Sequence, residues 1–324
     1  MSKILSMIGG VLAALLVAEL GLRAVGFQYR LIPTVQFGWP DPVALSTAYR
    51  ADRDVIWVPK DYDVSIALAQ KVHPAVIFMG DSCTEFGTYA SKTMALIKSG
   101  GGPMANVDGV KLGVGGWSSE QGRVQLLRDV VPLHPRVITV YYGWNDHWIA
   151  LGPTDPDLLI MRRFLWLSDH LRLLQVMLKA RIGASGVQST RPNRVSLDRY
   201  RANLDTIVRD ARQNNIVTVL ITAPSNHVPG HEPPYLLKRH VRTLEELVPL
   251  HRAYVDATRA AAKDTGAVLC DAAAAFEALP APHDTYFQKD GIHLTDAGDR
   301  QMAATLAPCV TNALRNQAEL TTSR

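Results

Sequence analysis

The stretch that decides the fold is residues 76 to 87, Val-Ile-Phe-Met-Gly-Asp-Ser-Cys-Thr-Glu-Phe-Gly, where an apolar run ends abruptly in Gly-Asp-Ser. The run that begins at His73 is too short for a helix and is rich in residues that suit a strand buried on both faces. Gly80 permits a sharp exit from this strand. If residues 82 to 98 follow as a helix, Ser82 lies at its N-terminus, where unpaired N–H groups and the helix dipole favour developing negative charge. A serine in this place can attack a carbonyl and offer its own N–H to the oxyanion that forms.

The competing interpretation of the tripeptide is an ordinary turn, in which Asp81 or Ser82 caps the following helix. The tripeptide alone does not separate a nucleophile from a cap. Three later segments of the chain bear on the choice.

Each of these segments follows a strand-like run or adds a residue type that acyl chemistry needs. Residues 111 to 119, Lys-Leu-Gly-Val-Gly-Gly-Trp-Ser-Ser, form a glycine-rich turn whose backbone can approach a ligand closely. The amide of Asn145, in Gly-Trp-Asn-Asp after the run at 136–142, can donate to an oxyanion. Asp290 precedes His293 by three residues, so that one turn of chain can orient the imidazole through a carboxylate contact. Nucleophile, oxyanion donors, base and orienting acid are then all present.

In this order, the four blocks resemble those of the SGNH hydrolases, the GDSL esterase/lipase superfamily, over roughly residues 73 to 315. The resemblance implies that Ser82 is the nucleophile, His293 the general base and Asp290 its orienting partner. It also implies an oxyanion hole made of the backbone of Ser82 and Gly116 and the side chain of Asn145. The implied reaction is acyl transfer through a covalent intermediate, resolved by water or by another hydroxyl.

Two blocks depart from the family pattern. Lys111 stands where many members have an asparagine five residues before the oxyanion glycine, which leaves Gly113 and Gly115 as alternatives to Gly116. The first block reads Gly-Asp-Ser-Cys-Thr rather than Gly-Asp-Ser-Leu, a variation that leaves the reactive atoms untouched.

Strand-like runs alternate along the chain with segments long enough to carry helices. The alternation predicts an α/β fold with a doubly wound, flavodoxin-like parallel sheet of about five strands flanked by helices, and every candidate site residue follows the carboxyl end of a strand. We expect a hydrolase domain over residues 73–318. The strand-like runs are 75–79, 106–112, 137–142, 216–222 and 267–270.

The N-terminus carries an uncharged, mostly apolar stretch, residues 4 to 18, followed by Glu19 and Arg23. Extended over residues 1–27 it is long enough to span a membrane, and the two charges, four residues apart, can pair on one helix face or Arg23 can snorkel. We favour an uncleaved signal anchor; a removed signal peptide and a buried helix of a soluble protein are the alternatives. Lys3 on the short flank favours a cytoplasmic N-terminus, which would leave the catalytic domain extracytoplasmic, in the periplasm or at the cell surface.

Two further segments fall outside the bare fold. Residues 28–72 contain several prolines and aromatics and are interpreted as an extended linker that packs on the domain surface. Residues 147–198 are an insertion, and within it residues 158–178 combine helical length, large apolar side chains and arginines. This helix is either an ordinary helix on the sheet, or a lid or interfacial helix that lies on the membrane.

Several residues near the four blocks are candidates for binding substrate, although packing in the core is the competing role for the tryptophans. They are Asp81, Trp117, Trp144, His147 and His227. No pair among the three cysteines has metal-ligand spacing, and no cofactor or metal is expected. A formal net charge of +4 without a nucleic-acid motif argues against a nucleic-acid partner.

Three functions follow from these features. The leading one is a membrane-anchored serine esterase that cleaves small acyl esters, with O-acetyl groups of an envelope glycan as candidate substrates. An O-acyltransferase in cell-surface polysaccharide modification would use the same residues. A non-catalytic glycan-binding protein is the third, but a binder has no need of nucleophile, base and oxyanion donors together.

Overall fold

The computed structural model describes residues 2–29, 47–69, 73–183, 190–280 and 282–322. Its centre is a parallel sheet of five strands in the order β4-β3-β5-β6-β7. The strands are β3 (Val76–Gly80), β4 (Gly109–Lys111), β5 (Val137–Tyr141), β6 (Val217–Ile221) and β7 (Val268–Cys270). The predicted doubly wound sheet is confirmed, and each of its strands lies inside a run predicted from the sequence, apart from Gly80 at the end of β3.

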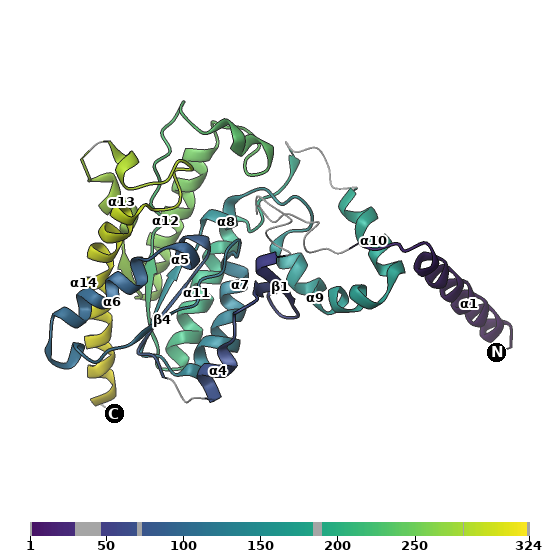
Figure 1. Ribbon diagram of the computed structural model, residues 1–324, viewed down its shortest axis with the longest axis horizontal. Coiled ribbons are helices and arrows are strands. Elements are labelled where there is room, and N and C mark those ends of the chain that lie inside the picture. The colour runs from purple at the N-terminus through teal and green to yellow at the C-terminus, as the bar shows by residue number, and fades with distance from the viewer. Residues whose placement is uncertain (1, 30–46, 70–72, 184–189, 281, 323–324) are drawn as a thin grey trace.

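Helices cover both faces of this sheet (Figure 1). One face carries α7 (Ser119–Gln125), α11 (Leu197–Gln213) and most of α12 (Leu247–Thr265), and the other carries α6 (Tyr89–Ser99), α13 (Ala272–Glu277) and α14 (Asp296–Thr322). Alternate residues of β3 supply the two cores. Ile77 and Met79 join the core beneath α11, while Val76 and Phe78 join the core beneath α14. All four are buried, as a central parallel strand requires.

The helix predicted over residues 82–98 is two helices, α5 (Ser82–Phe86) and α6. Gly87 interrupts them in an extended conformation, and a Cβ at this position would lie 2.4 Å from the carbonyl oxygen of Cys83. Lys111 secures the break, because its Nζ donates to the carbonyls of Glu85 and Gly87. The prediction missed this break because one glycine in a helical pattern is a weak signal.

The segment expected to be an extended linker is folded where the structure describes it. Residues 30–46 and 70–72, which include Trp39, lie outside the described residues. Strands β1 (Tyr49–Asp52) and β2 (Ile56–Pro59) form an antiparallel hairpin, and α4 (Val64–Ala69) follows. The hairpin is part of the core rather than a segment on the domain surface, since Ile56, Trp57 and Val58 are almost fully buried. The expectation of an extended segment is therefore wrong for residues 49–69.

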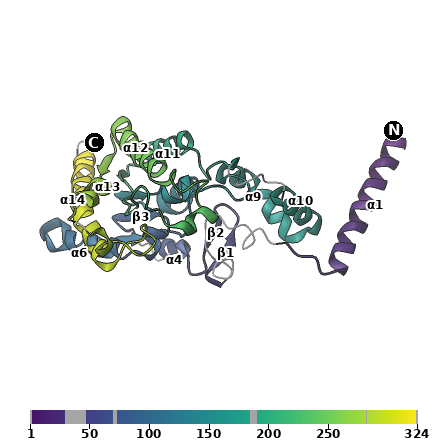
Figure 2. The same ribbon diagram turned by 90° about the horizontal axis from the view of Figure 1, so that it is seen from above.

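The insertion contains α8 (Trp144–His147), α9 (Asp155–His170) and α10 (Arg172–Gly183). The single helix expected over residues 158–178 is broken at Leu171, whose backbone is extended. The start of α9 joins the core, through Leu158 and Leu159. Figures 1 and 2 show α10 between the sheet and the N-terminal helix, so these helices do not lie on the sheet.

The N-terminal helix α1 (Ser2–Ala24) projects from the molecule (Figure 2). By length and composition its residues Lys3–Ala24 suffice to cross a membrane, and 6% of its most apolar window is buried. This matches the requirement for a membrane anchor or for a signal sequence. The expected pairing of Glu19 with Arg23 is present, with 2.9 Å between Oε1 and Nε.

Candidate active site

Ser82 is the first residue of α5, directly after the central strand β3. The turn that leads to it requires glycine, because a Cβ on Gly80 would lie 2.1 Å from Oγ1 of Thr84 and 2.8 Å from the carbonyl oxygen of Tyr141. The side chain of Ser82 is partly exposed, while those of Asp81 and Cys83 are buried on either side of it. The sequence therefore turns one hydroxyl outward at the carboxyl end of the sheet.

Asp81 caps α5 and is fully buried. Its Oδ1 accepts from the backbone N–H of Cys83 at 2.9 Å, and its Oδ2 accepts from Nδ2 of Asn145 at 3.1 Å. Burial raises its pKa to about 6 against these stabilising hydrogen bonds. The cap role raised as the competing interpretation is thus present, but it falls to Asp81 and leaves the hydroxyl of Ser82 available.

That hydroxyl contacts an imidazole 211 residues further along the chain. Oγ of Ser82 lies 2.9 Å from Nε2 of His293, and Nδ1 of His293 lies 2.6 Å from Oδ2 of Asp290. The second oxygen of Asp290 accepts from the backbone N–H groups of Ile292 and His293, at 2.9 and 3.0 Å. Because a carboxylate accepts, Nδ1 of His293 carries the proton and Nε2 is left to accept from the serine. The structure brings all three residues into one continuous chain of hydrogen bonds.

The charged forms of Asp290 and His293 stabilise each other. Burial alone would raise the pKa of Asp290, but the hydrogen bonds from His293 and Ile292 outweigh it, and the pKa lies below its ordinary value. Burial lowers the pKa of His293, but the hydrogen bond and charge of Asp290 and the charge of Asp81 together raise it, so that the net shift is upward. The carboxylate stays ionised and the imidazole is made more basic.

The other two expected members of the oxyanion hole lie on the turns after β4 and β5. Asn145 is in α8, and one of its two amide hydrogens goes to Asp81, which leaves the second to serve a ligand. Gly116 has a positive φ of 78°, a conformation that glycine adopts freely. Nε1 of Trp57, in the hairpin, donates to the carbonyl of Gly115 at 2.9 Å. Glu85 accepts from the backbone N–H of Gly115 on the opposite side of the loop.

Arg194 joins these two turns and was not singled out as a site residue from the sequence. Its side chain is 1% exposed, and it donates to the carbonyl of Gly116 at 2.7 Å and to Oδ1 of Asn145 at 3.4 Å. Its charge is balanced by Asp155, which is also buried and lies 2.8 and 3.1 Å away through two oxygens. The only signal in the sequence was an arginine in a basic stretch, which did not distinguish Arg194 from its neighbours.

His227 is half-buried, contacts the loop of the expected base and also lines a cavity beside that loop. Its Nε2 donates to the carbonyl of Asp290 at 2.8 Å, so its Nδ1 accepts from the hydroxyl of Ser225 at 3.0 Å. Burial lowers its pKa, which keeps the ring neutral. Asn226 adds a hydrogen bond from its N–H to the carbonyl of Gly291 at 3.0 Å. Residues 225–227 therefore hold the loop that carries Asp290 and His293.

Three of the expected substrate contacts are core residues in the structure, because the turns that carry them point their side chains inward. Trp117 is fully buried and donates to the carbonyl of Trp57. Trp144 stacks on His251, with ring centroids 3.9 Å apart, and His147 is buried against the same ring. These residues and Asp81, which caps α5, shape the site from beneath and have no surface with which to bind substrate.

An aromatic side chain that the sequence analysis passed over lies at the mouth of the site. Phe86 is 56% exposed, and its ring centroid is 6.3 Å from that of His293.

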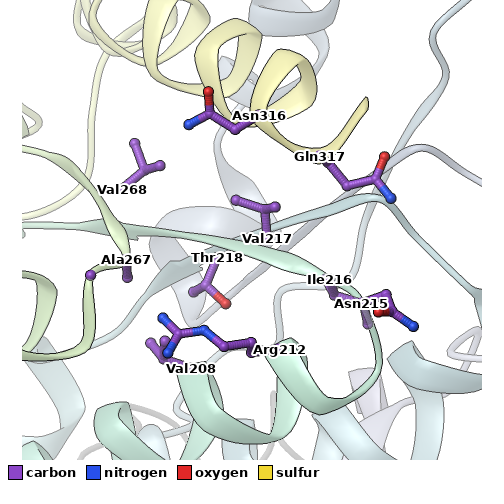
Figure 3. A pocket seen from close by; sticks show the side chains of 11 residues that line it. Val208, Arg212, Asn215, Ile216, Val217, Thr218, Ala267, Val268, Asn316 and Gln317 are labelled. Carbon is purple, nitrogen blue, oxygen red and sulfur yellow. The ribbon is translucent and has the colours of Figure 1, made fainter. Parts of the chain in front are cut away.

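The cavity drawn in Figure 3, about 520 Å³ and lined by residues such as Val217, Val268 and Asn316, lies at the amino ends of β6 and β7. It is at the opposite edge of the sheet from Ser82 and has no part in the site.

A serine, a histidine and an aspartate in hydrogen-bond contact at the carboxyl edge of a parallel sheet define the class of α/β serine hydrolases. The sequence matches the GDSL-like lipase/acylhydrolase family over residues 78–301. The chain belongs to this family and is a carboxylic ester hydrolase.

Two solved structures with TM-scores of 0.50 and 0.51 agree on the fold. The chain is similar to a lipase/acylhydrolase from Enterococcus faecalis, at 15% identity over 74% of this chain and 96% of that one, with a TM-score of 0.50. It is similar to a Parabacteroides merdae protein described as GDSL-like lipase, at the same identity and coverage, with a TM-score of 0.51. An acetylxylan esterase, Axe2 from Geobacillus stearothermophilus, is 15% identical over 75% of this chain and 94% of that one, with a TM-score of 0.46. No curated protein matches the sequence at a significant level.

Proposed function

We propose that this chain is a serine esterase that hydrolyses small acyl esters through Ser82, His293 and Asp290. The observation that carries the proposal is the unbroken chain of hydrogen bonds from Asp290 through His293 to Ser82, at 2.6 and 2.9 Å. Hydrogen-bond contact between a nucleophile and a base that is itself oriented by a third group is the signature of covalent acyl transfer.

In the proposed reaction, Nε2 of His293 takes the proton from Oγ of Ser82 as the oxygen attacks the ester carbonyl carbon. The N–H groups of Ser82 and Gly116 and the amide of Asn145 donate to the oxygen that becomes negative. Collapse of this intermediate expels the alcohol, which receives the proton from His293. Water then loses a proton to His293 and attacks the acyl group, which releases the carboxylic acid and restores Ser82. Asp290 stabilises the charged imidazole and does not take its proton.

We further propose a short acyl group on a sugar, with O-acetyl groups of an envelope glycan as the leading substrates. Phe86 supports this choice, because an exposed aromatic ring beside the imidazole offers an apolar wall to a sugar face. The partial exposure of His293, whose side chain is 27% exposed, leaves room for an alcohol as well as for water. An O-acyltransferase that passes the acyl group to a second glycan hydroxyl is therefore the second candidate function.

The localisation that we propose is an anchored one, with a signal anchor at residues 1–27 and a catalytic domain outside the cytoplasm that includes the hairpin β1-β2 as well as residues 73–318. An exposed apolar helix of 22 residues supports an anchor. Its contact with α10 supports retention, because Oε1 and Oε2 of Glu19 accept from the backbone N–H groups of Arg172 and Leu173, at 3.0 and 2.9 Å. Removal of α1 would take this partner away from the N-terminus of α10.

The test uses the full chain in detergent and compares wild type with Ser82→Ala. Hydrolysis of para-nitrophenyl acetate, butyrate and octanoate is followed, and Ser91→Ala, a change on the exposed side of α6, is the matched control. We expect turnover of acetate above octanoate, lost in Ser82→Ala and kept in Ser91→Ala. Turnover that persists in a folded Ser82→Ala protein would refute the serine mechanism. Acyl transfer to an added glycan acceptor at the expense of free acid would identify the transferase.

A further inference from the structure

The depth of Glu19 within α1 brings another part of the molecule to the membrane. A helix of 22 residues is about 33 Å long, close to the roughly 30 Å thickness of a hydrocarbon core. Glu19 lies five residues before the end of this helix, about 7 Å along its axis. If α1 spans the bilayer, the backbone of Glu19 lies roughly 6 Å inside the hydrocarbon boundary, where an unpaired charge is costly.

The junction between α9 and α10 supplies the partners that Glu19 needs at this depth. Its carboxylate accepts from the first two N–H groups of α10 and from Arg23, and Arg23 in turn donates to the carbonyl of His170 at 2.5 Å. Two further contacts continue along α10. The N–H of Tyr29 donates to Gln175 at 2.9 Å, and Nζ of Lys179 lies 5.7 Å from the ring centre of Phe27. The insertion is thus bound to α1 just beneath the lipid headgroups, at the depth where an interfacial helix lies.

The helices of this junction expose apolar side chains that nothing in the described structure covers. On α10, Met177 is 66% and Val176 38% exposed, and on α9, Ile160 is 75% and Leu167 38% exposed. Arg172 and Lys179 are basic residues on α10, which suits a surface rich in anionic headgroups. Apolar side chains with basic neighbours are the composition of an interfacial helix.

We propose that α9 and α10 contact the outer leaflet of the bilayer that α1 crosses, which gives the enzyme a second, interfacial attachment. This inference rests on the proposed membrane anchor. A single helix would leave the catalytic domain free to rotate and tilt, whereas two attachments hold Ser82 at a defined height above the lipid. Such a height suits a substrate that is itself a polymer of the cell envelope.

The test measures depth in the bilayer at single sites. The full chain is placed in nanodiscs of phosphatidylcholine and phosphatidylglycerol, with an environment-sensitive fluorophore on Met177→Cys, Leu16→Cys or Leu96→Cys, all in a Cys309→Ala background. Cys83 and Cys270 are buried and are left in place. Leu16 is in α1, and Leu96, 46% exposed, is in α6 at the far end of the molecule (Figure 1). Two sets of lipids are the quenchers, one with a nitroxide near the headgroup for position 177 and one with a nitroxide midway along the acyl chain for position 16, and both are applied to position 96.

We expect strong quenching at positions 16 and 177 and little at position 96. Adding Glu19→Gln should reduce quenching at position 177 at least twofold, because the carboxylate no longer holds α10, and should leave position 16 unchanged. Quenching at 16 without quenching at 177 would overturn the interfacial contact alone. No quenching at either position would overturn the anchor as well, and both results leave the esterase mechanism standing.

A second inference comes from the hydrogen bonds around the oxyanion turns, and it rests on the proposed mechanism. The N–H of Gly116 belongs to the same planar peptide group as the carbonyl of Gly115 and points the opposite way. Trp57 donates to that carbonyl, so it fixes the direction of the N–H. Arg194 holds the carbonyl of Gly116 and the amide oxygen of Asn145, so it fixes which way the amide hydrogens face.

We infer that Trp57 and Arg194 are positioning residues for the oxyanion hole. The first belongs to the hairpin that precedes the catalytic blocks and the second to the end of the insertion. Preorganised donors stabilise a transition state without reorganisation at the moment of reaction, so a loss of their orientation lowers kcat rather than substrate affinity. The hairpin and the insertion therefore both influence kcat, through the orientation of the oxyanion donors.

The variants are Trp57→Phe, which keeps the ring and removes the donor, and Arg194→Gln. We expect kcat to fall about tenfold in each with KM within about twofold, since one donor is worth at most 100- to 1,000-fold when removed outright. In an Asn145→Ala background, Arg194→Gln should cost less than about threefold, because the amide that it orients is gone. Circular dichroism and thermal unfolding confirm that each variant folds.

An unchanged kcat in a folded Trp57→Phe, together with full additivity of Arg194→Gln and Asn145→Ala, would overturn this inference. Arg194→Lys keeps the positive charge but loses the planar guanidinium group that can bond two acceptors at once. If orientation of the donors limits kcat, this variant should remain as slow as Arg194→Gln. If Ser82→Ala retains activity, the mechanism itself fails, which is a separate result.

Discussion

The two halves of the site are built in different ways. On the base side, Asp290 and His293 are three residues apart, and one short loop brings them together. On the oxyanion side, Trp57 lies 58 residues from Gly115, and Arg194 lies 78 residues from Gly116. The base and its orienting acid come from one short loop and are partly exposed, whereas the oxyanion half is buried and is held together by residues from distant segments. In the proposed mechanism, the first half transfers the proton and the second half stabilises the negative charge of the transition state.

Loss of the nucleophile Ser82, which contacts the base, should give the largest fall in kcat of all the variants. Ser82→Ala removes the only group that forms the acyl-enzyme in the proposed reaction, and we expect kcat to fall by about 1,000-fold or more, as for triad serines in other hydrolases. Steady-state hydrolysis of para-nitrophenyl acetate measures it. A fall of less than tenfold in a folded variant would remove Ser82 from the chemistry.

Loss of an oxyanion donor should come next. Asn145→Ala takes one donor from the developing negative charge, and kcat should fall on the order of 100- to 1,000-fold with little change in KM. The same assay separates the two constants. If KM rises and kcat stays constant, Asn145 binds the ground state and the comparison between the two halves fails.

Because the oxyanion side contains a buried ion pair, substitutions there should lower the free energy of unfolding more than substitutions on the base side. Asp155→Ala leaves Arg194 charged and without its carboxylate partner, and we expect the free energy of unfolding to fall by about 3–5 kcal/mol. Asp290→Asn, on the partly exposed base side, is the matched control and should cost much less. Urea unfolding followed by circular dichroism measures both. Equal losses would show that the two halves do not differ in this way.

The pH dependence of kcat/KM should report on His293, the base. Asp290 raises the pKa of His293 above its ordinary value, and the reaction needs the neutral imidazole. Thus kcat/KM should rise with pH through that pKa and be lost below it. In Asp290→Asn the midpoint should move to lower pH, because the raising charge is gone, while Ser91→Ala, on the exposed side of α6, should leave it unchanged. A midpoint that does not move in Asp290→Asn would contradict the assignment.

The smallest expected effect concerns the substrate wall. Phe86→Ala should raise KM for an O-acetylated glycan about threefold to tenfold, since a hydrophobic contact of this size contributes on the order of 1 kcal/mol. The value of kcat for para-nitrophenyl acetate, which has no sugar, should not change. A loss of kcat on both substrates would instead place Phe86 among the groups that orient His293.

The same contrast explains what could be predicted from the sequence. The five strands were readable because buried parallel strands form short apolar runs, and the contact between Asp290 and His293 was readable because it spans one turn of chain. The break at Gly87 and the buried hairpin at Trp57 were not, because each depends on tertiary contacts that no local pattern records. Arg194 was hidden for the same reason. A basic stretch looks like a solvated surface until the carboxylate of Asp155 is placed opposite it.

The central claim is that Ser82 forms an acyl-enzyme, and the most direct measurement is to trap the modified serine. The full chain is reacted with a fluorophosphonate, which mimics the tetrahedral intermediate, and the labelled peptide is identified by mass spectrometry. We expect one adduct, on Ser82, formed quickly in the wild-type protein and at least 100-fold more slowly in His293→Ala, since the general base is absent. An adduct on another residue, or labelling that does not depend on His293, would contradict it.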